Sequence, residues 1–93
     1  TGVTIAPGTY IGKNVQIFKN VTLAYVKKKT CKIDDNVILF SHVIVLGTTI
    51  GANCVIGAGS VVTTDVNDNC VMAGVPAKYV KKCEVSADYL EYV

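Results

Sequence analysis

The chain contains few of the residues that most often carry catalysis or bind metals. It has one His, one Met, two Pro and no Trp among its 93 residues. Zinc hydratases of the carbonic anhydrase type hold their metal through several His side chains. A single His therefore argues against that class of enzyme, and we expect no metal site in the chain.

Charge and hydropathy exclude two further kinds of partner. Nine basic and seven acidic residues give a net charge of +2, with no basic patch interleaved with aromatics, so we expect no nucleic-acid partner. No apolar run approaches the ~20 residues of a membrane span, and no signal peptide is visible. The four Cys are too widely spaced for a metal-binding pair. We therefore expect reduced thiols and a cytoplasmic protein.

A period of six organises the aliphatic residues. A helix would show a period near 3.6 and a half-buried strand a period of 2. A period of six instead predicts a coil whose sides each turn inward once, so that three hexads make one triangular turn. Two register breaks divide the series of anchors, which are Ile5, Ile11, Ile17, Leu23, Ile33, Leu39, Val45, Ile50, Ile56 and Val62.

The slots between the anchors predict tight corners. The position four residues after each anchor, which directly follows the corner, holds a small or β-branched residue. This slot includes Ser60 and Val66, and its side chains are expected to point inward. Ten hexads make little more than three coils. The corner positions themselves, three residues after the anchors, hold residue types that tolerate positive φ, and they are Gly8, Asn14, Asn20, Asn36, His42, Asn53, Gly59 and Asp65.

The two register breaks mark departures from the regular coil. Leu23 and Ile33 are ten residues apart, so four extra residues project from a loop that includes the lysine run 27–29. Such runs are usually solvated. The alternative is recognition of an acidic substrate or a phosphate, because insertions in repeat proteins often carry binding function. The hexad from Val45 to Ile50 is one residue short, for which the sequence offers no functional reason.

The second half of the chain carries its most specific motifs. Segment 50–66 reads IGANCVIGAGSVVTTDV, and segment 73–78 reads AGVPAK. Together they resemble the C-terminal half of hexapeptide-repeat acetyltransferases. Segments 2–5 and 11–23 look most like serine acetyltransferases and sugar O-acetyltransferases, and Ser41 to Val43 look like the sugar enzymes. The resemblance implies an all-β fold, a left-handed parallel β-helix. It also implies a homotrimer with acetyl-CoA bound between two prisms.

The domain organisation follows from where the repeat stops. We expect the β-helix over residues 1–75, with a loop insertion near 24–32, and a C-terminal cap or tail over 76–93. Ser86 is a suitable N-cap for a short helix in that tail. Because Thr1 is not an initiator residue and the repeat is under way by Ile5, we expect the chain to be part of a longer protein.

The resemblance also assigns a set of residues to acetyl-CoA. Backbone amides around Gly59 would hold the pantetheine arm, since small residues let a ligand approach the backbone. Lys78 would lie near the CoA phosphates, and Thr64 replaces the Lys of the family's Thr-Lys-Asp run. The alternative is that these are ordinary corner residues and a solvated lysine. The assigned residues are Ser41, Ala58, Gly59, Ser60, Thr63, Thr64 and Lys78.

The catalytic residue is not identified by the sequence. Serine acetyltransferases use a His as general base, and by resemblance its position lies before Thr1. Thr30 occupies the place of a second family His. The one His of the chain, His42, fills a corner slot, which favours a structural or CoA-lining role over that of a base.

Two functions from different classes follow. The first is an acetyl-CoA-dependent O-acetyltransferase that acts on a small hydroxyl acceptor, either serine-type or a sugar. The alternative is a truncated, non-catalytic hexapeptide module that forms trimers and binds CoA without turnover. The residues that would shape an acceptor pocket are not recognisable in this chain, so the sequence does not identify the acceptor.

Overall fold

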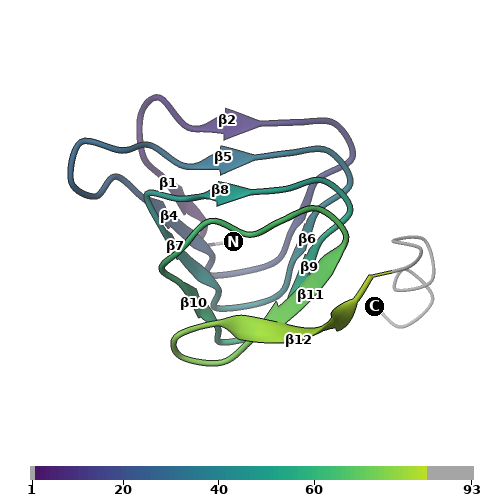
Figure 1. Cartoon of the computed structure of the whole chain (residues 1–93). Helices are drawn as coiled ribbons and strands as arrows, with labels where there is room; N and C mark the ends of the chain where they lie inside the picture. The colour runs from purple at the N-terminus through teal and green to yellow at the C-terminus, as the bar shows by residue number, and fades with distance from the viewer. Residues whose placement is uncertain (1, 84–93) are drawn as a thin grey trace.

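A computed structural model describes residues 2–83, and in these residues the chain forms a parallel β-solenoid of about four turns (Figure 1). The all-β fold class predicted from the hexad period is confirmed. Three sheets form the sides of a triangular prism. Sheet A contains β1 (Thr4–Ile5), β4 (Thr22–Ala24), β7 (Ile44–Leu46) and β10 (Val61–Val62). Sheet B contains β2 (Tyr10–Ile11), β5 (Lys32–Ile33) and β8 (Thr49–Ile50). Sheet C contains β3 (Gln16–Ile17), β6 (Ile38–Leu39), β9 (Val55–Ile56), β11 (Cys70–Ala73) and β12 (Lys78–Lys82).

The predicted anchors stack in register along the prism. In sheet C, Ile17 pairs with Leu39, and Leu39 pairs with Ile56. Sheets A and B repeat this arrangement, so each anchor lies directly above the equivalent anchor of the preceding coil. From Leu23 onward the anchors are at most 1% exposed, whereas Ile5 in the first coil is 47% exposed. The aliphatic columns therefore form the core of the prism.

Most of the predicted corners adopt positive φ. Asn14, Asn20, Asn36, His42 and Asn53 have φ between 56° and 66°, and Gly8 and Gly59 are positive as well. The prediction for Asp65 is wrong, because the chain between Val62 and the next strand position is shorter than the hexad pattern implies. Val66 pairs with Ile50 and so takes the anchor position of sheet B only four residues after Val62. It does not occupy the slot beside a corner that the pattern assigned to it.

The corner between sheets B and C, the B–C corner, is closed by side chains of successive coils. Asn14 donates to Asn36, and Asn36 donates to Asn53, each at 3.2 Å. The Asp35 carboxylate accepts the Lys13 N–H at 2.7 Å, and the Asp68 carboxylate accepts the Ala52 N–H at 2.9 Å. These contacts satisfy backbone donors that a tight corner leaves unpaired.

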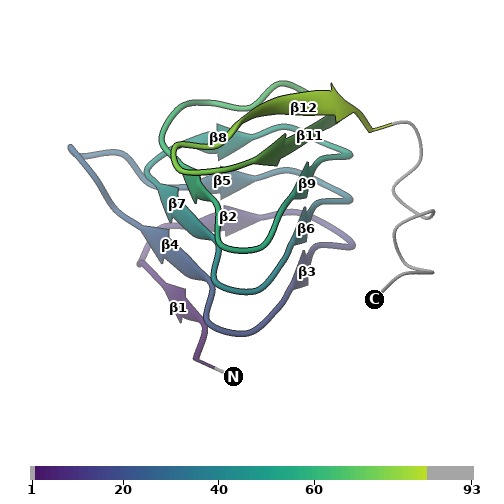
Figure 2. The same ribbon diagram turned by 90° about the horizontal axis from the view of Figure 1, so that it is seen from below.

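The last turn ends in a strand that the hexad pattern did not indicate. After β11 the chain reverses, and β12 runs antiparallel to β11, so that it forms the outer edge of sheet C (Figure 2). The helix predicted from Ser86 lies outside the described residues. The boundary between repeat and cap at residues 75 and 76 stays a prediction.

Candidate functional site

Residues Ser41 and Ala58 lie one above the other at the corner between sheets C and A, the C–A corner. The Gly59 N–H donates to the Ser41 carbonyl at 2.9 Å, which fixes the stacking of the two coils. Ala58 and Gly59 are exposed. Gly59 has φ +74°, and a Cβ built on it would meet no atom within 4 Å. The structure thus brings part of the predicted set together on an open, small-residue surface.

Two backbone N–H groups at this corner have no partner in the part of the chain that the structure describes. Within residues 2–83, the N–H groups of Ser41 and Ala58 donate to no other residue. The equivalent N–H groups of Lys13 and Ala52 at the B–C corner are capped by carboxylates of the next coil. The C–A corner therefore offers hydrogen-bond donors to a ligand, whereas those two positions of the B–C corner do not.

Ser60 follows this corner but turns inward. It is 1% exposed, and its Oγ accepts the Gly74 N–H at 3.1 Å. The Ser60 hydroxyl therefore holds the loop before β12 against the corner. Its inward direction agrees with its slot in the hexad, so any contact of Ser60 with a ligand would come from its backbone.

Lys78 lies beyond the C–A corner on the same side of the prism. It is exposed, begins β12 and pairs with Ala73 of β11. The Ala73 side chain in turn lies 3.3 Å from the Cβ position of Gly57. Two strand spacings of about 4.8 Å place Lys78 roughly 10 Å from Gly57. This separation leaves room for a ligand that extends from the corner to the Lys78 ammonium group.

Thr63 and Thr64 lie at a different corner, between sheets A and B, which we call the A–B corner. Thr63 is three residues beyond Ser60, or roughly 10 Å along the chain at about 3.3 Å per residue. Both are exposed. The predicted cofactor residues are thus divided between the two ends of β10 rather than gathered in one place.

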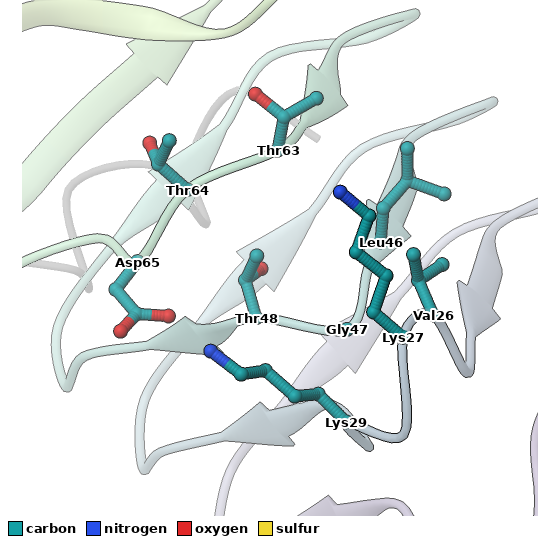
Figure 3. Close-up of a pocket in the computed structure, with 9 residues that line it drawn as sticks. All are labelled: Val26, Lys27, Lys29, Leu46, Gly47, Thr48, Thr63, Thr64 and Asp65. Atoms are coloured by element: carbon teal, nitrogen blue, oxygen red, sulfur yellow. The ribbon is translucent and has the colours of Figure 1, made fainter.

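The A–B corner contains a pocket of about 500 Å³ (Figure 3). Three segments line it: the hairpin 26–29, which is closed by an antiparallel bridge between Val26 and Lys29, the shortened corner 46–48, and the segment 63–65. The hairpin is the predicted insertion, and it projects from the prism between β4 and β5 (Figure 2). The sequence signalled both the insertion and the short hexad, but not that the two meet.

His42 is held by its neighbour in the column of corners. The Asn20 Nδ2 lies 3.1 Å from the His42 Nε2, so with the amide donating, that ring nitrogen is an acceptor. The backbone N–H of His42 donates to the Lys19 carbonyl at 3.0 Å. The side chain is exposed at φ +66°, in the same column as Gly59. These contacts give His42 a structural place at the C–A corner.

The four thiols are free and mostly built into the prism. Cys31, Cys54 and Cys83 are buried, and Cys70 is half-buried. The Cys31 Sγ lies 3.4 Å from both the Ala24 and the Val45 carbonyl oxygens. Burial raises the pKa of the Cys54 thiol to about 11, so this group is protonated at neutral pH and is a poor nucleophile.

The described part of the chain has no cluster of three or more His, Cys, Asp or Glu side chains placed to share a metal ion. Among the same residues, no helix is long and apolar enough to cross a membrane.

Sequence comparison identifies the family. The family described as the hexapeptide repeat of succinyl-transferase matches residues 30–64 and 47–75. Galactoside O-acetyltransferase from Escherichia coli is 40% identical over 87 residues, which cover 77% of this chain and 43% of the relative. Serine acetyltransferase 2 from Arabidopsis thaliana is 39% identical over 89 residues, which cover 90% of this chain and 28% of the relative. The chain belongs to the hexapeptide-repeat acetyltransferases. It spans less than half the length of either relative.

Solved structures of this family have the same fold. Serine acetyltransferase from Neisseria gonorrhoeae superposes with a TM-score of 0.85 at 38% identity, covering 95% of this chain and 36% of that one. A serine acetyltransferase in complex with CoA gives a TM-score of 0.81 at 32% identity, covering 86% and 34%. Another, in complex with cysteine, gives 0.83 at 31% identity, covering 87% and 36%.

Proposed function

We propose that the chain forms the acetyl-CoA-binding β-solenoid of an O-acetyltransferase whose acceptor is a small hydroxyl compound, serine-type or a sugar. The observation that carries this proposal is the C–A corner, where the unpaired N–H groups of Ser41 and Ala58 lie beside the exposed backbone of Gly59. The amide groups of a pantetheine arm need such donors, and the small residues allow close approach. The related serine acetyltransferase in complex with CoA supports this choice of ligand.

The reaction would transfer the acetyl group from sulfur to oxygen. The acceptor hydroxyl loses its proton to a base as its oxygen attacks the thioester carbonyl, and CoA leaves as a thiolate that takes up a proton. A positioned base typically contributes 10²- to 10⁴-fold to such a step. We propose that this base is not His42, since the Asn20 amide already occupies the His42 Nε2.

A second function is favoured by the same observation on His42. Residues 2–83 contain no other His, and the structure uses this one at a corner. A chain that binds CoA without turnover, as a non-catalytic module, is therefore the alternative. Activity of the intact protein separates the two functions, because the module would bind acetyl-CoA but release no thiol. The four free cysteines support a reducing, cytoplasmic location for either function.

Replacing His42 tests its role directly. We expect His42→Asn to unfold at nearly the same temperature as the unsubstituted chain, since Asn20 occupies the equivalent corner at φ 59°. We also expect thiol release by the intact enzyme to stay within about tenfold, or about 1.4 kcal/mol in the barrier. A thiol-release assay on both proteins measures this. If His42→Asn abolished turnover without unfolding the protein, His42 would be the base.

We also propose a homotrimer. Apolar side chains near the end of the described chain are exposed, with Val75 at 73%, Tyr79 at 61% and Val80 at 56%. Closed cyclic assemblies bury such surface on every subunit, and a 93-residue chain buries little apolar surface alone. Light scattering at micromolar concentration should give about three times the 9.9 kDa mass of one chain. A mass of one chain at that concentration would contradict the trimer.

A further inference from the structure

The pocket at the A–B corner owes its shape to the short hexad. Gly47 has φ +56°, and a Cβ built on it would lie 2.9 Å from the Lys29 carbonyl oxygen and 3.0 Å from that of Val26. The hairpin therefore packs its backbone directly on the shortened corner. The next residue, Thr48, is placed at the floor of the pocket between the hairpin and segment 63–65 (Figure 3).

Thr48 carries the feature that points to a ligand. It is only 7% exposed, and among residues 2–83 its Oγ1 is the buried side-chain polar atom without a hydrogen-bond partner. Buried hydroxyls are nearly always paired, and an unpaired one is unfavourable. Thr48 lines the pocket. Its Oγ1 is covered in the present rotamer, so an acceptor in the pocket would satisfy the hydroxyl once the side chain turns to a neighbouring staggered rotamer.

The charge of the pocket selects an anion. Lys27 and Lys29 extend into it from the hairpin (Figure 3), and within the described residues neither ammonium group has an ion-pair partner. Asp65 is the single acidic group of the lining, and its Oδ1 already accepts the Thr49 N–H at 2.9 Å. Thr63 and Thr64 are the other polar side chains at the rim.

We propose that this pocket is a binding site for a phosphoryl group. The ammonium groups of lysines act as point charges that suit phosphate. A phosphoryl group has three acceptor oxygens, which can take the Thr48 hydroxyl and both lysines together. Its source is either free phosphate or the 3′-phosphate of CoA. The assignment to CoA rests on the proposed function, whereas the phosphoryl site itself does not depend on it.

The hairpin provides a matched pair of variants. Lys27 and Lys28 are adjacent, both have positive φ, at 52° and 64°, and Lys27 lines the pocket whereas Lys28 does not. Lys27→Gln and Lys28→Gln change the net charge equally. Thr48→Val removes the hydroxyl while keeping the shape of the side chain, so it should raise the unfolding temperature and at the same time weaken phosphate binding.

Titration of the full chain with inorganic phosphate, followed by amide chemical shifts, tests the site. We expect shifts at Thr48, Thr63 and Thr64, a loss of affinity of about tenfold in Thr48→Val, a clear loss in Lys27→Gln, and less than a twofold change in Lys28→Gln. The proposal is overturned if phosphate leaves these amides unmoved, if Thr48→Val binds as well as the unsubstituted chain, or if both lysine variants weaken binding equally.

Comparison of CoA with dephospho-CoA, which lacks the 3′-phosphate, identifies the source. Weaker binding of dephospho-CoA, with phosphate competing only against CoA, would assign the pocket to the 3′-phosphate. Equal binding of both, with phosphate still bound in the pocket, would assign it to free phosphate. If phosphate binds in the pocket but acetyl-CoA binds nowhere, the proposed function fails and the phosphoryl site stands. If acetyl-CoA binds and phosphate does not, the phosphoryl site fails and the proposed function stands.

Discussion

Acetyl-CoA binding is expected to fall by about 100-fold or more in an Ala58→Trp variant, which corresponds to about 2.7 kcal/mol. Ala58 is exposed at the C–A corner, and its N–H is one of the donors without a partner there. An indole ring at this position would cover the neighbouring backbone of Gly59 and Ser41. The pantetheine arm would then lose both its space and its hydrogen bonds. Isothermal titration calorimetry measures the effect.

Lys13→Trp is the matched control for this variant. Lys13 is exposed and holds the equivalent place, two residues after an anchor, at the B–C corner. The same ring is added there to a corner whose N–H is already capped by Asp35. We expect Lys13→Trp to bind acetyl-CoA as the unsubstituted chain does. Equal affinity of Ala58→Trp and Lys13→Trp would remove the C–A corner from the binding site.

Leu39→Ala is expected to destabilise the chain by about 3 kcal/mol, within the range of about 2–5 kcal/mol for such truncations. Leu39 is fully buried in β6, between Ile17 of the coil before and Ile56 of the coil after. The neighbouring strands are held by ladder hydrogen bonds and cannot collapse fully into the space left by the side chain. For a domain with a total stability of about 5–15 kcal/mol, this is a large fraction.

Ile17→Ala provides the comparison within the same column. Ile17 is only half-buried, in the first coil, so the same kind of truncation should cost about half as much. Urea denaturation at a fixed protein concentration gives both values, because association would make stability depend on concentration. Similar losses for the two variants, or a loss below about 1 kcal/mol for Leu39→Ala, would mean that the column is not the core of the prism.

The regular part of the prism is predictable because each position of the hexad requires the same kind of residue in every repeat. An anchor such as Leu39 must fill the interior, and a corner such as Asn36 must tolerate positive φ. These two requirements repeat every six residues, so the sequence alone indicates which residues stack. The pairing of Leu39 with Ile56 follows from counting.

The last turn departs from the prediction because backbone geometry there is set by tertiary contacts. The side that begins at Val62 reaches its next anchor, Val66, after four residues rather than six. Asp65 therefore caps the Thr49 N–H with its side chain instead of forming a positive-φ corner. No local pattern distinguishes this use of Asp from a turn-forming one.

The candidate site was predictable in part, for a similar reason. The hexad slot of Ser60 indicated an inward side chain, and the structure places its Oγ against Gly74. Ser41 and Ala58 come together because they hold the same slot in successive coils. The pocket at Thr48 was not predictable, because it depends on how an insertion and a deletion in different coils pack against each other. In the sequence, only the lysine run 27–29 and the one-residue-short hexad from Val45 to Ile50 indicated a departure from the regular coil here.

Amide chemical-shift mapping during titration with acetyl-CoA tests the central proposal most directly. A ligand at the C–A corner should move the amides of Ser41, Ala58 and Gly59 first, because their N–H groups are donors or neighbours of donors there. Shifts of Lys78 should accompany them, while those of Lys13 and Ala52 at the B–C corner should stay unchanged. Saturable shifts confined to the B–C corner, or no saturable shifts at millimolar acetyl-CoA, would contradict the proposal that this chain is the acetyl-CoA-binding part of an O-acetyltransferase.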